Sequence, residues 1–485
     1  MKAGIIGYGG YLPRLRLSRQ AVYEANAWFA PGMKGRARGS RAMANWDEDS
    51  VTMAVAAARD CLGADEDRSH IGGLILVSNT LPFADRLNAG IAAAALTLDE
   101  DVDAIDLTGT RRAALSGISQ AIAKAGMLEA NVLLAASDLR KTRAASAAEL
   151  DYGDGAAALL FGTGTVLAEF LGSAAVTVDF VDHFRGAGAD FDYVWEERWI
   201  RDEGVTKIAP RAVETALDKA GLAATGIHHF IFPTAMAGLA AQLARTCGLD
   251  PSAVVDTLAA QIGDIGAGHA LLVLAHVLER AEPGQNILLL EFGSGAEAVV
   301  LRVTEAIRSF RPKRGVSAWL DRRLEETSYT KFLAFRGQLE LEKGMRGEQD
   351  KKTALSTLYR HRAAIMGLIA GRCRETGSVH FPPSRLSYDT VGAALDTQEP
   401  YKLADRKARV LSWSAETLSY YMAPPHHFGQ VDFEGGGRIL MEFTDVAPGE
   451  VDTGMEMEMV FRVKDRDPLR NFTRYFWKAT PAGAA

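Results

Sequence analysis

Short, almost wholly apolar runs alternate with longer helical patterns along residues 1–305. The apolar runs at 71–78 and 131–136 have the length and composition of buried strands. Residues 47–62 instead have the spacing of an amphipathic helix, with acidic residues near its start. This alternation of buried strands and helices predicts an α/β fold.

The stretch 104–136 is the clearest part of this pattern. An apolar strand leads into a tight turn at Thr108-Gly109, an alanine-rich helix follows, and another buried strand ends the stretch. Such a turn places a side chain at a helix N-terminus, beside unpaired N–H groups and the positive end of the helix dipole. Thr108 is therefore expected at a position suited to a nucleophile or a bound anion.

The same order of elements recurs later in the chain. A shift of 155 residues places 131–134 on 286–289, and it places Thr108-Gly109 on Gly263-Asp264. A shift of 156 residues places the apolar run that begins at 71 on the run that begins at 227. This repeat predicts two pseudo-symmetric α/β halves whose helix-start turns meet near one central site.

The character of the chain changes after residue 303. A short basic run leads to Trp319, a helix is expected over 329–342, and a charged linker over 344–352. Short strands separated by turns then follow, which is typical of a small β-barrel. We therefore expect four parts: α/β halves at 1–170 and 171–305, a basic and helical connector at 306–370, and a β-barrel domain at 371–485.

Composition excludes several functional classes for this chain of 485 residues. A net charge of −7 without a long basic run argues against a nucleic-acid partner. The longest apolar runs are too short for a membrane span, and residues 1–13 have the pattern of a first core strand. The three cysteines are far apart in sequence, which favours a reducing cytoplasm over a disulfide framework.

Five short motifs in the first part resemble those of the thiolase superfamily, and most closely its hydroxymethylglutaryl-CoA synthase-like branch. They are DEDSVTM at 47–53, ASDLR at 136–140, GDGAAA at 153–158, GDIGAG at 263–268 and FGSG at 292–295. The resemblance implies a five-layer thiolase fold, an acyl-CoA thioester substrate, carbon–carbon bond chemistry and a homodimer formed through this domain.

The last part resembles the zinc-ribbon and OB-fold domain that accompanies thiolase-like proteins acting on acyl-CoA. The resemblance rests on GRC at 371–373, Gly377, FPP at 381–383 and the turn before Met455. Four zinc-binding cysteines are implied, but only Cys373 is present, and Thr376 stands at its partner's position. Because a structural zinc site needs four ligands, we expect a degenerate ribbon with no metal and no cofactor other than coenzyme A as part of the substrate or product.

The chain also departs from the catalytic pattern that the resemblance implies. The position of the acyl-accepting cysteine falls at Thr108, that of the histidine at Ile231, and that of the asparagine at Asp264. The glutamate of the synthase branch falls near Thr80. A threonine hydroxyl is a poor nucleophile without an activating base, so a covalent acyl-enzyme mechanism is not expected.

Three residues are candidates for catalysis. Asp264 is either a base at a helix start or an N-cap. His269 is either a base or oxyanion donor directed into the site, or a packed helix residue. Thr108 either donates a hydrogen bond to a substrate oxygen or fills the place of the lost cysteine.

Four further residues are candidates for substrate binding. Asn79 either lines the pocket or is a turn residue at the end of a strand. The segment 192–199, DYVWEERW, lies in an insertion where the family shapes its acyl pocket. Its Tyr193, Glu196 and Arg198 are either substrate contacts or part of a solvated helix face.

These considerations lead to two functional hypotheses. In the first, the chain is an enzyme that cleaves a 3-oxoacyl-CoA by a hydrolytic retro-Claisen reaction, or a 3-hydroxyacyl-CoA by a retro-aldol reaction. Acetyl-CoA or propionyl-CoA would be released, and the aromatic residues of 191–199 hint at an aromatic acyl group. In the second, the chain is a non-catalytic acyl-CoA-binding or scaffolding partner of an active thiolase.

Overall fold

The computed structural model of the protein describes residues 3–63, 67–345, 354–389 and 392–483. Residues 346–352 of the expected charged linker lie outside this described part. The chain divides into two compact units. The first unit comprises Met1–Ala44, Met53–Gly90 and Asp99–Phe332, and the second comprises Asn45–Thr52, Ile91–Leu98 and Leu333–Ala485.

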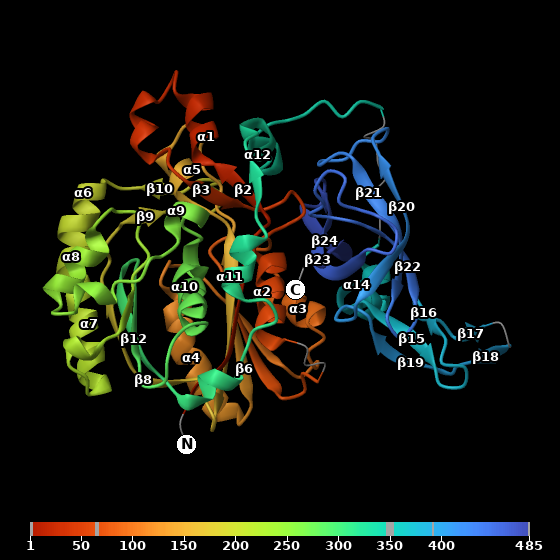
Figure 1. The fold of residues 1–485 in the computed structure, drawn as a ribbon, viewed down its shortest axis with the longest axis horizontal. Helices are drawn as coiled ribbons and strands as arrows, with labels where there is room; N and C mark the ends of the chain where they lie inside the picture. The colour runs from red at the N-terminus through yellow and green to blue at the C-terminus, as the bar shows by residue number, and fades with distance from the viewer. Residues whose placement is uncertain (1–2, 64–66, 346–353, 390–391, 484–485) are drawn as a thin grey trace. The chain divides into compact units, whose positions relative to one another are not determined.

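The first unit is built on a nine-stranded sheet with the strand order β11-β12-β13-β8-β1-β7-β6-β4-β5 (Figure 1). One half of the sheet contains β1 (Ala3–Tyr11), β4 (Ile71–Val77), β5 (Asp103–Leu107), β6 (Asn131–Asp138) and β7 (Gly155–Thr163). The other half contains β8 (Ala168–Thr177), β11 (His229–Ile231), β12 (Asn286–Phe292) and β13 (Gly295–Val303).

The two halves repeat the same topology. β4 pairs in parallel with β6, and β11 pairs in parallel with β12, as the shift of 155 to 156 residues requires. In each half this parallel pair is followed by two antiparallel strands, β7 and β1 in one half and β13 and β8 in the other. The predicted pair of pseudo-symmetric α/β halves is confirmed.

Two helices lie between the halves and bury a common core. α4 (Ala113–Leu128) and α10 (His269–Leu278) share one hydrophobic cluster with the inner faces of both halves. α7 (Thr206–Ala220) and α8 (Leu239–Thr246) form a second cluster against the other face of the β8–β11 half. With residues 53–62 of α2 (Ser50–Leu62) against β1, the unit has five layers (Figure 1).

The second unit contains a five-stranded antiparallel sheet with the order β22-β21-β20-β23-β24. The strands are β20 (Ala408–Glu416), β21 (His426–Phe433), β22 (Arg438–Glu442), β23 (Glu456–Asp467) and β24 (Phe472–Pro481). Smaller hairpins precede it, among them the pairing of β15 (Ile369–Cys373) with β16 (Val379–His380) and β19 (Gln398–Lys402). The strands expected for a small barrel domain are therefore present.

One predicted element is shorter than expected. α12 spans only Tyr329–Phe335, whereas the sequence suggested a helix over 329–342. Gly337 adopts a left-handed φ of +67°, and its N–H bonds to the Ala334 carbonyl. A glycine in this conformation ends a helix. Separately, none of the helices in the described ranges is both long and apolar enough to cross a membrane.

The contact between β1 and α2 gives a test of the layer packing. A methyl group at Gly9 would lie 2.3 Å from the Cys61 backbone nitrogen, and backbone atoms cannot yield as a flexible side chain can. We expect Gly9→Ala to lower the free energy of unfolding by about 3 kcal/mol, measured by urea denaturation. The control is Gly126→Ala, on the exposed side of α4 with open space around its Cα, which should be neutral or stabilising. Equal effects of the two changes would contradict the packing described.

Candidate active site

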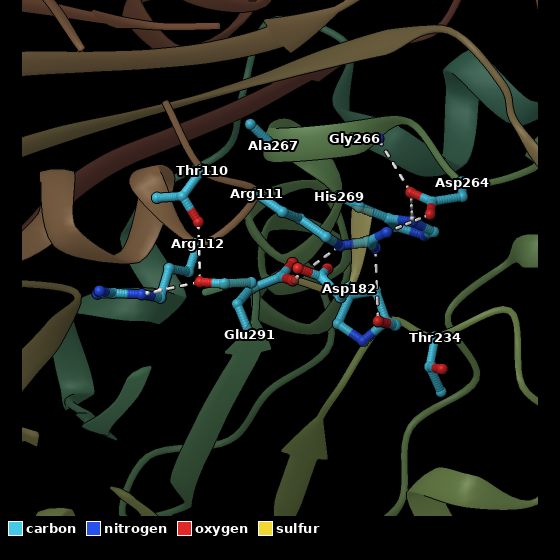
Figure 2. Close-up of polar contacts among 12 residues, drawn as sticks. Thr110, Arg111, Arg112, Asp182, Thr234, Asp264, Gly266, Ala267, His269 and Glu291 are labelled. Atoms are coloured by element: carbon cyan, nitrogen blue, oxygen red, sulfur yellow. Dashed lines mark hydrogen bonds and ion pairs between the residues drawn. The ribbon is translucent and has the colours of Figure 1, made fainter. Parts of the chain in front are cut away.

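The two helix-start turns meet, as the repeat predicted. Between β5 and α4 the chain passes through Gly109, which has a φ of +100° and whose N–H donates to Asn79 Oδ1 at 3.0 Å. Arg111, two residues further on, extends to Asp264 on the second turn, and its Nη1 donates to Asp264 Oδ2 (Figure 2). The meeting point of the turns is thus an ion pair between residues 153 positions apart.

Asp264 is held by several groups at once. Besides Arg111, Arg140 donates from Nη2 to the Asp264 carbonyl at 2.6 Å and approaches Oδ1 at 3.2 Å. The Gly266 N–H also donates to Oδ1, at 2.9 Å (Figure 2). Burial acts to raise the pKa of Asp264, but the two guanidinium groups outweigh it and hold the pKa well below its ordinary value. A carboxylate so stabilised is a poor proton acceptor, so of the two roles considered from the sequence the geometry favours a structural one over that of a base.

His269 is a packed residue at the start of α10. It is 1% exposed, its Nδ1 lies 3.3 Å from Asp264 Oδ1, and its Nε2 lies 2.8 Å from the Thr257 carbonyl oxygen. A carbonyl only accepts, so Nε2 carries a proton and donates it there. Both ring nitrogens are engaged within the protein, which leaves His269 without the open nitrogen that a base would need.

Glu291 completes the charged cluster from β12. Its Oε2 accepts a hydrogen bond from Arg111 Nε at 3.1 Å (Figure 2), while its buried Oε1 has no hydrogen-bond partner in the described structure. Burial raises the pKa of Glu291 to about 7, although Arg111 acts in the opposite direction. Glu291 can therefore exchange a proton near neutral pH.

The remaining residues predicted near the turns have structural positions. Thr108 is exposed and stands in the loop before α4. Asn79 joins the ends of two strands: its side chain bonds to Gly109 and to the Thr110 carbonyl, and its own N–H donates to Asp138 Oδ1 at 2.7 Å. Neither residue lines the cavity described next.

A cavity of about 340 Å³ opens beside Arg111 and Asp264 in the first unit. Its apolar wall contains Trp195, Phe232, Phe292 and Met236, and its polar wall contains Arg36, Arg140, Tyr152 and His183. The Arg140 guanidinium lies over the Tyr152 ring, 3.5 Å from its centroid, and this contact fixes both groups at the wall. A volume and lining of this kind suit a small organic ligand.

The segment 192–199 borders the cavity, but through residues other than those expected. Val194, Trp195 and Glu197 line it. Tyr193, Glu196 and Arg198 are exposed and do not line it. Tyr193 and Val194 form the short strand β10 (Tyr193–Val194), in which neighbouring side chains point to opposite faces.

Sequence reasoning missed the pair formed by Asp182 and His183. His183 Nδ1 lies 2.8 Å from Asp182 Oδ2, and both residues line the cavity. Burial acts to raise the pKa of Asp182, but the hydrogen bond and charge of His183 outweigh it and lower that pKa. In the described structure the other ring nitrogen, His183 Nε2, makes no hydrogen bond, so the carboxylate orients an imidazole with one open nitrogen. The adjacent Asp-His shortly before the segment 192–199 was the available signal.

Sequence reasoning also missed Arg111, which brings a guanidinium group to the cavity. Three of its five N–H groups are engaged: with Asp264, with Glu291, and with the Pro233 carbonyl at 3.4 Å (Figure 2). Within the described ranges, its other two N–H groups have no partner and remain for a ligand oxygen. Because the guanidinium is fixed by two carboxylates, it is a preorganised donor.

The residues described offer no metal site. No group of three or more His, Cys, Asp and Glu side chains in the described ranges could hold a metal ion. Around Cys373, hydroxyl groups occupy the space instead: its Sγ lies 3.1 Å from Thr397 Oγ1, which in turn donates to Ser387 Oγ. The Thr376 N–H also donates to Sγ, at 3.4 Å.

Comparison with known protein families matches two parts of the chain. Residues 217–303 match the C-terminal part of 3-oxoacyl-[acyl-carrier-protein (ACP)] synthase III. Residues 401–462 match the C-terminal OB-fold domain of ChsH2. These matches fall in the second α/β half and in the five-stranded sheet, respectively.

Curated relatives are similar over most of the first unit. Hydroxymethylglutaryl-CoA synthase of Aeropyrum pernix is 30% identical over 352 residues, which covers 70% of this chain and 96% of the relative. Hydroxymethylglutaryl-CoA synthase of Methanocaldococcus jannaschii is 27% identical over 348 residues, 70% of this chain and 100% of the relative.

Solved structures show the same fold. MvaS in complex with 3-hydroxy-3-methylglutaryl coenzyme A superposes with a TM-score of 0.61 at 22% identity, over 69% of this chain and 91% of that one. The 3-oxoacyl-(acyl carrier protein) synthase III of Pseudomonas aeruginosa superposes with a TM-score of 0.57 at 23% identity, over 63% of this chain and 99% of that one. The predicted fold, thiolase-like followed by an OB-fold domain, is confirmed.

Glu291 predicts a specific dependence of stability on pH. Its pKa is raised on folding, so its contribution to stability is complete below its ordinary pKa of 4.5 and is lost as the pH rises through about 7. The free energy of unfolding of the unmodified protein should therefore fall between pH 5 and pH 8 as Glu291 loses its proton. In Glu291→Gln this fall should be smaller, by up to about 3 kcal/mol. Urea denaturation across this range measures the difference. Glu305→Gln, at an exposed ion pair, serves as the control; parallel pH curves for Glu291→Gln and the unmodified protein would contradict the assignment.

Proposed function

The chain belongs to the hydroxymethylglutaryl-CoA synthase family of thiolase-like proteins, and on this basis we propose that it cleaves a carbon–carbon bond of a 3-oxoacyl-CoA by hydrolysis. The chain is a distant homologue of condensing enzymes that act on acyl-CoA. One observation carries the proposal: the Asp182–His183 pair and the partly open guanidinium of Arg111 line the same cavity.

The cavity does not suit the usual condensation chemistry. A covalent acyl intermediate needs a nucleophile with an adjacent base. Thr108, at the position of the expected cysteine, is exposed and outside the cavity. Ile231, at the position of the expected histidine, is buried and cannot move a proton. These positions support a reaction that proceeds without an acyl group on the enzyme, as proposed.

Arg111 supplies what the cleavage of a 3-oxoacyl thioester requires. When the bond between C2 and C3 breaks, the electron pair moves into the thioester, and its oxygen becomes an enolate. The two open N–H groups of Arg111 can donate to this oxygen, and Asp264 and Glu291 keep the guanidinium in place. Donors fixed before the charge develops stabilise it without reorganisation.

His183 is the group that can activate water. Its Nε2 takes a proton from a water molecule, and the oxygen of that water forms a bond to C3. Collapse of this adduct breaks the C2–C3 bond and yields a carboxylic acid and the enolate. The imidazolium of His183 then returns its proton to C2, which gives the shortened acyl-CoA. Asp182, 2.8 Å from Nδ1, stabilises the imidazolium in between.

The walls of the cavity indicate the acyl group. Trp195, Phe232 and Phe292 present aromatic surface to the same space as the charged groups. Aromatic side chains contribute large apolar contact area and favour stacked or edge-on partners. The acyl portion beyond C3 is accordingly proposed to be bulky, with an aromatic group preferred, and the released thioester to be acetyl-CoA or propionyl-CoA.

The first test is the incubation of the purified protein with aromatic and aliphatic 3-oxoacyl-CoAs in water labelled with ¹⁸O, without added coenzyme A. We expect the label in the released acid and the formation of acetyl-CoA or propionyl-CoA. His183→Asn should lower kcat at least about a hundredfold, because it removes the base. Asp182→Asn should lower kcat by a smaller factor, since it alters only the orientation and charge of the imidazole. Mass spectrometry of the products measures both.

The control and the contrary outcomes are specific. His361→Asn changes an exposed histidine of the second unit and should leave the rate unchanged. An aldehyde or ketone formed only from 3-hydroxyacyl-CoAs would replace hydrolysis with a retro-aldol reaction. Tight thioester binding without turnover would contradict an enzymatic role for the isolated chain and favour a binding partner of another thiolase.

A further inference from the structure

The second unit contains a cavity that the proposed chemistry does not use. Its volume is about 470 Å³, within the range of small-molecule sites. All the residues that line it belong to the second unit: Trp46, Ala334, Phe335, Gly337, Lys343, Ser419, Tyr420, Tyr421, Met422, His426, Glu442, Val463, Lys464, Asp465 and Arg466. Aromatic and basic side chains are prominent in this set.

The aromatic wall is held in a fixed arrangement. Trp46 meets Tyr421 edge-on with ring centroids 5.3 Å apart, and Tyr421 stacks on His426 at 4.2 Å. The buried Lys478 lies behind them: its Nζ is 4.3 Å from the Trp46 ring centroid and 2.9 Å from Asp47 Oδ2. Rigid rings of this kind offer a planar ligand contact area at low entropic cost.

Two cations at the cavity have no carboxylate partner. In the described part of the chain, neither Lys343 nor Arg466 forms an ion pair, although both are exposed and line the cavity. Lys343 lies 5.6 Å from the centroid of the Tyr420 ring. Lys464, in contrast, is neutralised by Glu442. The cavity therefore joins an aromatic surface to two positive charges that are available to an anion.

A third polar group faces inward. His426 Nε2 is buried and has no hydrogen-bond partner in the described structure. His426 also borders a neighbouring cavity of about 240 Å³, lined in addition by Phe428, Leu440 and Phe476. A buried ring nitrogen without a partner is costly unless a ligand or water satisfies it. Burial lowers the pKa of His426, so its ring is neutral at pH 7 and can either donate or accept.

We propose that this cavity binds a purine nucleoside phosphate. The base lies against the aromatic wall, as planar bases do on tyrosine and tryptophan, and its polar edge meets His426. Arg466 and Lys343 bind the phosphate, for which a guanidinium and an ammonium are the usual partners. A free nucleotide and the nucleotide portion of coenzyme A share this chemistry. Identification of the ligand as coenzyme A rests on the proposed function.

Calorimetric titration of the full chain tests the site. The probes are adenosine 3′,5′-bisphosphate, AMP, coenzyme A and pantetheine, which lacks the nucleotide. We expect the bisphosphate and coenzyme A to bind and pantetheine to bind much more weakly. Arg466→Glu and Lys343→Glu should each weaken binding of the bisphosphate by about tenfold or more. Arg374→Glu, at an exposed arginine of the same unit outside the cavity, should leave it unchanged.

The outcomes separate this proposal from alternatives. Binding of AMP as tight as that of the bisphosphate and coenzyme A would support a free nucleotide as the ligand. A lack of saturation at millimolar bisphosphate, or binding that both charge reversals leave intact, would overturn the site. Binding of a short single-stranded oligonucleotide without binding of mononucleotides would also overturn it, in favour of a nucleic-acid surface. Raising the salt concentration should weaken bisphosphate binding to the unmodified protein, which tests the charge contribution without a mutation.

Failure of the nucleotide site and failure of the proposed catalysis are distinguishable. His183→Asn should bind the bisphosphate as the unmodified protein does, because His183 belongs to the other unit. If the unmodified protein binds the bisphosphate but cleaves no 3-oxoacyl thioester, the site stands and the hydrolytic function falls. If it cleaves thioesters of pantetheine and of coenzyme A equally well and binds no bisphosphate, the hydrolytic function stands and the nucleotide site falls.

Discussion

The ion cluster of Asp264 with Arg111 and Arg140 is the interaction on which the site depends. A carboxylate removed from water is stable only when cations and hydrogen bonds replace its hydration. Here the two cations come from different places, one from the turn before α4 and one from the end of β6, and the carboxylate comes from the turn before α10. The cluster thereby fixes the two pseudo-symmetric halves at the point where their turns meet, and it fixes Arg111 at the edge of the cavity.

This arrangement is the basis of the proposal that a thiolase-like scaffold here carries a different chemistry. The positions expected to carry a nucleophile and a base hold Thr108 and Ile231, and neither moves protons in the cavity. In the proposed reaction, Arg111 provides the positive charge at the centre, and His183, which precedes the segment 192–199, transfers the proton. The proposed hydrogen-bond donor, Arg111, comes from the same turn as Thr108, whereas the proposed base, His183, comes from a segment away from the positions where the family resemblance placed catalysis. The same fold can support a different reaction class because the function depends on these few side chains.

The sequence was sufficient for the architecture because its signals are local or periodic. Apolar runs identified the strands, and the shift of 155 residues identified the two halves and the meeting of their turns. The site was harder to predict. Arg111 and Asp264 are far apart in sequence and meet only through the tertiary fold. The sequence around each residue therefore does not show that they form an ion pair. The segment 192–199 was located correctly, but a two-residue strand has too little periodicity to show which side chains face inward. Asp182 and His183 lie where another two-residue strand, β9 (His183–Phe184), begins, so their adjacency was the available signal and no helix or strand period marked them.

The distribution of sulfur in this protein has a chemical consequence. Cys61 is buried against β1, burial raises the pKa of its thiol far above the ordinary value, and no cysteine is among the described residues that line the Arg111 cavity. Enzymes with a reactive thiolate are inactivated by peroxides and by alkylating agents, because the nucleophilic sulfur is itself the target. The reaction proposed for this cavity uses a guanidinium and an imidazole and no thiolate, so on that proposal it would not be lost by oxidation or alkylation of a nucleophilic sulfur, whereas the reaction of a cysteine-dependent relative would be.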